Sequence, residues 1–291
     1  IKLSRSWGYK KKNIQKNKAV ILFAKNNFWG RTIAACSSST DPTCYENFGP
    51  YTPGFKTIPY DNLEELENAF KEDSNIAAFM IEPIQGEAGI IVPQKDYLFN
   101  AKKLCEKYNI LLIADEIQSG LGRSGKMPAS DYDNIKPDIL CLGKALSGGT
   151  YPVSAVLANN NIMDCITPGT HGSTYGGNPI AATVAKVSLE VLQEENMIEN
   201  SFRMGNYFRE ELEKLYDCNS PLVNIRGKGL FNAIELESSN ITEKVCKNLI
   251  KNGLLAKSTH DINIRLCPPL IINKIQIDES LEIIRKSIKN L

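Results

Sequence analysis

Two residues of opposite charge stand directly after short apolar runs of the sequence. The run 109–114 leads into the acid Asp115, and the run 139–142 leads through one glycine into the amine Lys144. An amine held among apolar neighbours can act as a nucleophile toward an aldehyde. The two residues therefore predict a site that binds a cofactor.

Both apolar runs predict buried strands of a parallel sheet. Each run lacks polar alternation and is too short for an isolated core helix, a pattern typical of strands covered on both faces. Ligands of open α/β sheets bind outside the carboxyl ends of the strands, where the acid and the amine would lie. Taken alone, Asp115 is more typical of a turn or a helix cap, and Lys144 is more typical of a solvated side chain. The glycine-rich segment 143–149 favours the cofactor, because it lets the backbone approach a bulky ligand.

Composition excludes several classes of protein. The chain has 291 residues, of which 42% are hydrophobic and 23% charged, as in ordinary globular proteins. The net charge is +1, from 34 basic and 33 acidic residues, so no global field favours nucleic acid or a membrane surface. No apolar run approaches the roughly 18 residues of a membrane span. Small anionic substrates would have to be bound by individual arginines.

Cysteines and glycines give no sign of a metal or a nucleotide. The eight cysteines include no C-x-x-C pair and have no neighbouring histidine, which argues against zinc. No phosphate-binding loop of the nucleotide-binding type occurs, so a nicotinamide dehydrogenase is disfavoured. We expect Cys36 and Cys44 to be exposed, because they lie in a polar segment, and a redox role for them is a further hypothesis.

The first part of the chain predicts an α/β domain. Within residues 1–190, strands are expected at 18–25, 75–81, 109–114 and 137–142, and helices at 61–71 and 97–108. Asp61 is the expected cap of the first of these helices, and 37–59 is expected to be irregular. The alternation of strands and helices predicts a mainly parallel sheet with right-handed crossovers.

The second part predicts a smaller α+β domain over 191–291. The helices expected from about 179 onward lie at 179–195, 197–215, 242–252 and 278–289. Strands are expected at 223–226, 230–236 and 264–266, with an extended segment near 255. Since the sequence begins with Ile1, in what reads as the tail of a helix, we also expect a further N-terminal segment to precede it.

Five ordered motifs resemble those of class III pyridoxal-phosphate aminotransferases. They are NFWGRT at 27–32, EPIQGEAG at 82–89, ADEIQ at 114–118, GKALSGG at 143–149 and HGSTYGGNP at 171–179. The resemblance extends over essentially the whole chain. It implies fold type I of the pyridoxal-phosphate enzymes, an α/β fold with a large parallel-sheet domain and a small C-terminal domain. It also implies a homodimer with sites at the interface.

The resemblance assigns cofactor roles to individual residues. Lys144 would bind the aldehyde of pyridoxal 5′-phosphate and then serve as base and acid, and Asp115 would keep the ring nitrogen protonated. Gln118 would donate a hydrogen bond to the ring 3-oxygen, and Phe28 would stack on the ring, although alone it is typical of a core aromatic.

Phosphate binding is implied only in part by this sequence. Ser173 and Thr174 match the residues that reach the phosphate of the neighbouring subunit in the family. The resemblance places the other phosphate contacts, in a glycine-rich turn, and the substrate-binding tyrosines upstream of Ile1. His171 is expected to be structural and His260 to be solvated.

The implied activity is transfer of the δ-amino group of L-ornithine to 2-oxoglutarate, giving glutamate-5-semialdehyde and glutamate. Arg31 matches the arginine that binds the α-carboxylate of ornithine and the distal carboxylate of 2-oxoglutarate. Arg265 matches the one that binds the α-carboxylate of 2-oxoglutarate, and Glu87 would neutralise it while ornithine is bound. Planar guanidinium groups suit carboxylates, although either arginine also fits a surface ion pair.

Alternatives remain open at this stage. Another class III ω-aminotransferase, acting on acetylornithine or 4-aminobutyrate, fits the same motifs. A catalytically inert chain that keeps only the fold is an alternative of a different class. The expected compartment is the cytoplasm, with the mitochondrial matrix as the alternative, and the expected partners are small molecules and a second copy of the chain.

Overall fold

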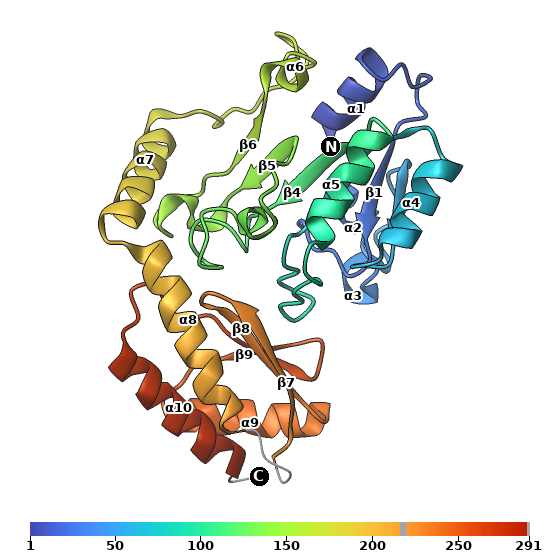
Figure 1. The fold of residues 1–291 in the computed structure, drawn as a ribbon. Helices are drawn as coiled ribbons and strands as arrows, with labels where there is room; N and C mark the ends of the chain where they lie inside the picture. The colour runs from blue at the N-terminus through green and yellow to red at the C-terminus, as the bar shows by residue number, and fades with distance from the viewer. Residues whose placement is uncertain (216–219, 290–291) are drawn as a thin grey trace. The chain divides into compact units, whose positions relative to one another are not determined.

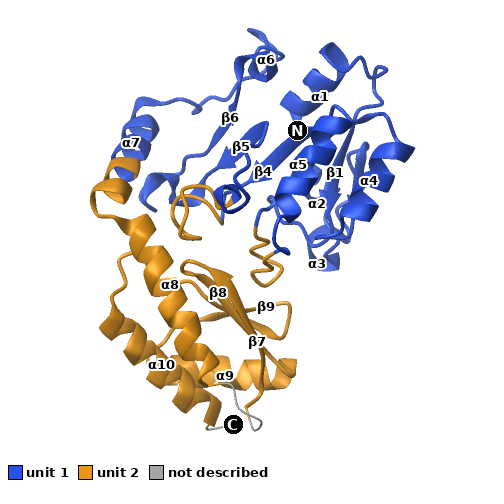
Figure 2. Cartoon of the chain, in the orientation of Figure 1, with its two compact units in different colours: residues 1–83, 93–118, 130–188 blue, residues 84–92, 119–129, 189–291 orange. Residues whose placement is uncertain are grey.

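The chain forms two compact units in the computed structural model, which describes residues 1–215 and 220–289. Unit 1 comprises residues 1–83, 93–118 and 130–188, and unit 2 comprises 84–92, 119–129 and 189–291 (Figure 2). Two loops from the first half of the sequence thus belong to unit 2. The domain boundaries expected from the sequence, 1–190 and 191–291, stay a prediction. Cys218 lies outside the described residues.

Unit 1 is built on a six-stranded sheet with the order β2-β1-β3-β4-β5-β6 (Figure 1). The strands are β1 (Val20–Ala24), β2 (Phe55–Ile58), β3 (Ile76–Ile81), β4 (Leu111–Asp115), β5 (Ile139–Leu142) and β6 (Ala155–Ala158). Neighbouring strands from β2 to β5 run parallel, whereas β6 runs antiparallel to β5. The prediction of a mainly parallel sheet is therefore confirmed.

Helices cover both faces of this sheet, which explains its continuous apolar strands. Leu22, Phe79 and Leu112 pack in one cluster with residues of α4 (Leu63–Glu72) and α5 (Tyr97–Lys107). Their strand neighbours Ile21 and Ile113 point to the other face and pack with residues of α1 (Lys2–Lys10) and α6 (Asn160–Met163). Since successive side chains of a strand alternate between faces, only the strand ends are left for polar groups.

The segment 37–59 is more ordered than its composition predicts. It contains α3 (Pro42–Tyr45) and the edge strand β2, and it follows α2 (Ile33–Cys36). Cys36 and Cys44 are both buried, so the expectation that they are exposed is wrong. The polar residues around them form local caps and turns, and these leave the thiols facing inward.

The cap of α4 also differs from the expectation. Asn62, not Asp61, caps the helix, since its side chain accepts a hydrogen bond from the backbone N–H of Glu65 at 2.9 Å. Asp61 instead adopts a left-handed conformation with φ 59°, and its carboxylate accepts from the backbone N–H of Gln94 at 2.9 Å. Both residue types favour caps, so the sequence alone did not separate them.

Unit 2 carries a four-stranded antiparallel sheet with the order β7-β8-β10-β9. The strands are β7 (Leu222–Lys228), β8 (Phe231–Leu236), β9 (Lys257–Thr259) and β10 (Asn263–Leu266). Ile234 and Ile264 face a core shared with α8 (Met197–Glu213), α9 (Ser239–Lys251) and α10 (Lys274–Lys289). On the alternate positions of β8, Phe231 and Ala233 pack instead against Ile84 and Ile90 of the loop 84–92.

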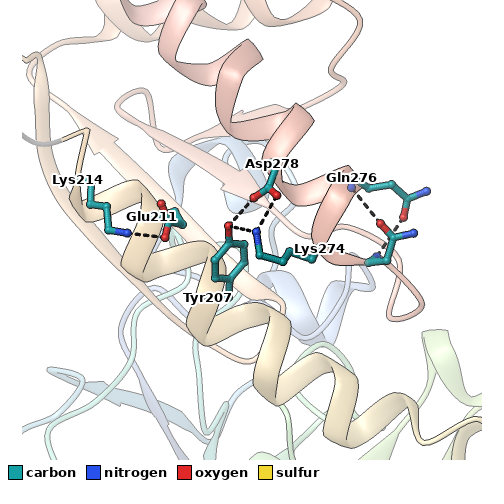
Figure 3. A network of polar contacts seen from close by, with 7 residues as sticks. Tyr207, Glu211, Lys214, Lys274, Gln276 and Asp278 are labelled. Carbon is teal, nitrogen blue, oxygen red and sulfur yellow. Dashed lines mark hydrogen bonds and ion pairs between the residues drawn. The ribbon is translucent and has the colours of Figure 1, made fainter.

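A polar network joins α8 to the start of α10 within unit 2 (Figure 3). Lys274 Nζ donates to Tyr207 Oη and to Asp278 Oδ2, both at 2.8 Å, and the Tyr207 hydroxyl donates to the other oxygen of Asp278. Asn273 and Gln276 exchange backbone-to-side-chain hydrogen bonds that cap α10. The remaining elements are α7 (Pro179–Glu194) and two 3₁₀ segments, Ala129–Asp133 and Lys144–Ser147.

Candidate active site

Asp115 is the last residue of β4, and the residue is only 4% exposed. One carboxylate oxygen accepts a hydrogen bond from the backbone N–H of Ile117 at 3.1 Å. Burial raises the pKa of Asp115 to about 6, against the opposing influence of this hydrogen bond and of the Lys144 charge. A buried carboxylate of this kind is suited to receive a cationic group.

Lys144 begins the 3₁₀ segment that follows β5. Its backbone has φ 44°, in the left-handed region, where a residue with a Cβ costs on the order of 1–2 kcal/mol. Because β4 and β5 are parallel neighbours, with Asp115 opposite Cys141, the acid and the amine are delivered to the same edge of the sheet. The charge of Lys144 acts on the carboxylate of Asp115 and lowers the pKa of this acid, in opposition to burial.

A hollow of about 760 Å³ opens beside Lys144 within unit 1. Its lining includes Tyr151, Ser154, Ser173 and Asn178. The volume falls in the range of cofactor sites. Tyr151 and Ser154 were not among the residues expected from the sequence, although their position just after the glycine pair 148–149 was a usable signal.

Gln118 and Phe28 take up positions compatible with a bound ring. The side-chain nitrogen of Gln118 is buried and has no hydrogen-bond partner among the residues that the structure describes, so a donor is left for an oxygen of a ligand. The backbone N–H of Phe28 donates to Glu82 Oε1 at 3.0 Å, which fixes the start of the segment 28–31. Glu82 thereby orients this segment.

Arg31 is an exposed cation close to Phe28. Its guanidinium carbon lies 5.6 Å from the centroid of the Phe28 ring, and Nη1 lies 3.9 Å from Cys44 Sγ. Within residues 1–215 and 220–289, Arg31 forms no ion pair with a carboxylate. It is thus able to bind the carboxylate of a substrate.

Ser173 and Thr174 lie on the exposed segment 171–177. Ser173 Oγ accepts from the backbone N–H of Gly176 at 3.0 Å. The start of this segment is attached to α1, because Lys2 Nζ donates to the Thr170 carbonyl at 3.0 Å and lies 3.3 Å from His171 Nδ1. Ser173 lines the hollow of its own chain, and its contact with a neighbouring subunit stays a prediction.

Unit 2 contains the other expected pair. Arg265 on β10 donates to Glu87 Oε1 at 2.9 Å, and the two side chains are 15% and 29% exposed. Glu87 lies on the loop 84–92, which belongs to the same unit. The pair therefore has the arrangement implied for the ornithine-bound state, while its role toward substrates stays a prediction.

Sequence comparison identifies the family. The profile described as "Aminotransferase class-III" matches residues 1–288. The chain belongs to this family. It is 56% identical over 290 residues to "Ornithine aminotransferase, mitochondrial" of Drosophila melanogaster, covering 100% of this chain and 67% of that relative.

Solved structures of other aminotransferases share the fold. The ornithine aminotransferase of Toxoplasma gondii ME49 has a TM-score of 0.97 at 46% identity, covering 99% of this chain and 69% of that one. The acetylornithine aminotransferase of Elizabethkingia anophelis has a TM-score of 0.87 at 46% identity, covering 100% and 70%. The chain spans about two thirds of the length of these relatives, and its fold is the α/β fold type I of pyridoxal-phosphate enzymes.

Class III aminotransferases use pyridoxal 5′-phosphate, and the residues of unit 1 fit this cofactor. The buried Asp115 suits a pyridine nitrogen, the unpartnered nitrogen of Gln118 suits a ring oxygen, and Lys144 stands at the edge of the hollow. Among the described residues, no cluster of His, Cys, Asp and Glu suitable for a metal occurs, and no helix is long and apolar enough to cross a membrane.

Proposed function

We propose that this class III aminotransferase transfers the δ-amino group of L-ornithine to 2-oxoglutarate, giving glutamate-5-semialdehyde and glutamate. The observation that carries the proposal is the ion pair of Glu87 with Arg265 at 2.9 Å. A pocket that serves a monocarboxylate donor and a dicarboxylate acceptor needs a cation that can be neutralised for one of them. The name of the Drosophila relative at 56% identity supports the same substrate.

The residues of unit 1 would carry the amino-transfer chemistry. When bound, pyridoxal phosphate supplies an aldehyde that accepts the amino group and a ring that withdraws electrons. Lys144 Nζ would hold the aldehyde carbon and then move the proton from the donor carbon. Asp115, ionised above its raised pKa of about 6, would hold the ring nitrogen in its protonated form. Gln118 would orient the ring through its buried amide nitrogen.

The three charged residues would select the substrates. Arg31 would bind the α-carboxylate of ornithine and the distal carboxylate of 2-oxoglutarate. Arg265 would bind the second carboxylate of the dicarboxylate once Glu87 has moved away. A guanidinium forms two parallel hydrogen bonds with a carboxylate, which gives this exchange its geometric selectivity.

The substrate is tested by single half-reactions of the purified holoenzyme. Ornithine, acetylornithine and 4-aminobutyrate are mixed in turn with the enzyme, and loss of the visible cofactor absorbance is followed. Ornithine is expected to react with the highest kcat/KM. Faster reaction of acetylornithine, which the Elizabethkingia structure makes the second candidate, would contradict the proposal.

An inert chain that keeps only the fold is separated from an enzyme by borohydride reduction. The intact mass of the reduced protein should increase by one pyridoxyl group, and peptide mapping should locate it on Lys144. An unmodified Lys144 after incubation with excess cofactor would favour the inert alternative. The combination of a buried acid, an unpartnered amide and an adjacent lysine supports the enzyme.

We propose a homodimer with sites at the interface. Apolar side chains of unit 1 are exposed on β6 and on the segment 175–187, namely Val156, Leu157, Tyr175, Ile180 and Val187. Exposed apolar groups of this kind suit a protein partner. Sedimentation should give twice the chain mass, and Leu157→Glu with Ile180→Glu should give the chain mass.

The compartment is also a proposal. The sequence favours the cytoplasm with the mitochondrial matrix as the alternative, and the name of the Drosophila relative, which includes the word mitochondrial, supports the mitochondrion. Fractionation of cells that contain the native protein distinguishes the two.

A further inference from the structure

The loop 84–92 that carries Glu87 is held to the sheet of unit 2 at several points. Its two arms form a bridge between Gln85 and Ile91, with reciprocal backbone hydrogen bonds at 3.0 and 2.9 Å. The Thr259 hydroxyl, at the end of β9, donates to the backbone carbonyl of Glu87 at 2.6 Å. The backbone of Glu87 is therefore fixed independently of its carboxylate.

Arg226 on β7 provides the second attachment of the loop. Its Nε donates to the Gly89 carbonyl at 3.0 Å, two residues beyond Glu87. Its Nη1 pairs with Glu235 on β8 and its Nη2 donates to Asn263 on β10. The side chain is only 13% exposed, so this guanidinium spans three strands and the loop in a largely dry setting.

Gly89 makes this close approach possible. It has φ 110°, a conformation that residues with a Cβ rarely adopt. A Cβ at this position would lie 2.9 Å from Asn263 Cγ and 3.2 Å from Arg226 Nη2. The backbone can therefore lie directly against Arg226 only because residue 89 is glycine.

Glu87 could leave Arg265 in two ways, by movement of the whole loop or by rotation of its own side chain, and these attachments favour the second. If the loop were free, the whole segment could move with its glutamate. Because hydrogen bonds hold the carbonyls of Glu87 and Gly89, the backbone stays in place and the carboxylate moves by rotation of its own side chain. A fixed backbone also returns the carboxylate to Arg265 once a dicarboxylate has left.

We infer that Arg226, together with Thr259, is a positioning residue that keeps Glu87 in place to neutralise Arg265 and so sets the preference between monocarboxylate and dicarboxylate substrates. The inference rests on the proposed function, since it assigns the selectivity of that reaction to a residue outside the pair. Arg226 acts through the loop and through Glu87, and it needs no contact with substrate.

The test compares the holoenzyme with Arg226→Gln, Arg226→Lys and Thr259→Val, and uses Arg285→Gln as the matched control. Arg285 is 45% exposed and pairs with Glu282 on the surface of α10, so its loss removes an arginine without touching the loop. Thr259→Val removes one hydroxyl donor at nearly constant volume. Arg226→Lys keeps the charge but has a single nitrogen to share among the acceptors.

The first readout is hydrogen exchange of the amides of residues 85–91. Loss of one hydrogen bond in Thr259→Val should speed exchange about 5-fold, and loss of the guanidinium in Arg226→Gln about 10-fold or more, with Arg226→Lys in between. The second readout is the ratio of kcat/KM for the glutamate half-reaction to that for ornithine. This ratio should rise in the variants, as it should in Glu87→Gln, and the rise should be about 5-fold for Thr259→Val.

Exchange rates and ratios that match those of Arg285→Gln would overturn the inference. Faster exchange with an unchanged ratio would also overturn it, because the loop would then be held without effect on selectivity. A wild-type enzyme that does not react with ornithine would contradict the proposed function instead. That result needs no variant, and the exchange data would still decide whether Arg226 holds the loop.

Discussion

The two sheets present their functional groups in different ways. In unit 1, the acid ends β4 and the amine follows β5, and the interiors of these two strands are apolar. In unit 2, Arg226, Glu235, Asn263 and Arg265 project from within antiparallel strands. The difference follows from the number of sheet faces that helices cover. Helices pack on both faces of the parallel sheet, but on only one face of the antiparallel sheet.

The covering of each sheet determines where it can tolerate polar groups. A fully covered sheet leaves only its edge for reactive groups, and burial there shifts the pKa of an acid, as it does for Asp115. A sheet whose second face is covered by a loop instead of helices can place charges at alternate residues, where they pair across strands and with that loop. We therefore expect chemical reactivity from the first sheet and substrate selection from the second.

The largest effect is expected from Lys144→Ala. Loss of the amine should lower ornithine turnover at least about 10³-fold, because the covalent and proton-transfer roles disappear together. Turnover is measured with saturating cofactor, and Lys103→Ala on α5 serves as the control. Full turnover by Lys144→Ala would break the assignment of chemistry to the strand ends.

Asp115→Asn should remove the pH dependence that the buried acid imposes on the cofactor-free protein. Its folded-state pKa of about 6 lies above the usual 3.8, so the folded state is destabilised as pH rises from about 4 to about 6. At pH 8 the variant should be more stable by up to about 3 kcal/mol, which corresponds to a shift of about two pH units.

Urea unfolding at pH 4 and at pH 8 measures this change in the free energy of unfolding. At pH 4 the two proteins should differ little, since the wild-type acid is then mostly protonated. A variant less stable than the wild type at pH 8 would show that burial of Asp115 carries no cost. The same variant should bind cofactor more weakly, which separates stability from function.

The sequence predicted the strand ends of unit 1 well, because the apolar runs before Asp115 and Lys144 are too short and too continuous for core helices. It failed where local composition misleads. The strand β2 was missed because it is only four residues long and has Pro59 directly after it. Burial of Cys36 was not expected, because the polar composition around it does not show that local caps and turns leave the thiol facing inward.

The selectivity region was predicted only in part. The motif at 82–89 contains Glu87 and the family resemblance assigned Arg265, but neither pointed to Arg226. The hydrogen bond from Arg226 to the Gly89 carbonyl joins residues that are 137 positions apart in the sequence. These residues come close in space only because of the register in which β7 pairs with β8. Cross-strand pairing is a property of topology, which periodicity does not encode.

Arg265→Lys should have an intermediate effect on activity, and it tests whether unit 2 selects the substrate. A lysine keeps the charge but cannot form two parallel hydrogen bonds with a carboxylate, so KM for 2-oxoglutarate should rise about tenfold. The ornithine half-reaction should change less. Equal losses in the two half-reactions would contradict a role in selecting the dicarboxylate.

The smallest effect is expected from Asp278→Asn in the network between α8 and α10. Lys274 and Tyr207 hold the pKa of this exposed acid below its usual value, so its contribution to stability is present above that value and is lost as pH falls. Exposed pairs contribute little, and Tm at pH 7 should change within about 2 °C. A large change in either half-reaction would show that the helical face of unit 2 also affects selectivity.

Because Lys144 has a left-handed backbone, the residue that is best for catalysis at this position is not the residue that is best for stability. Glycine and asparagine adopt this conformation at lower cost than lysine, so each would relieve local strain. A library screened for heat resistance alone should therefore accumulate the substitutions Lys144→Gly and Lys144→Asn and lose its activity. Selection for growth that depends on the reaction product should return lysine, and the frequencies in the two libraries would measure how strongly stability and catalysis compete at one residue.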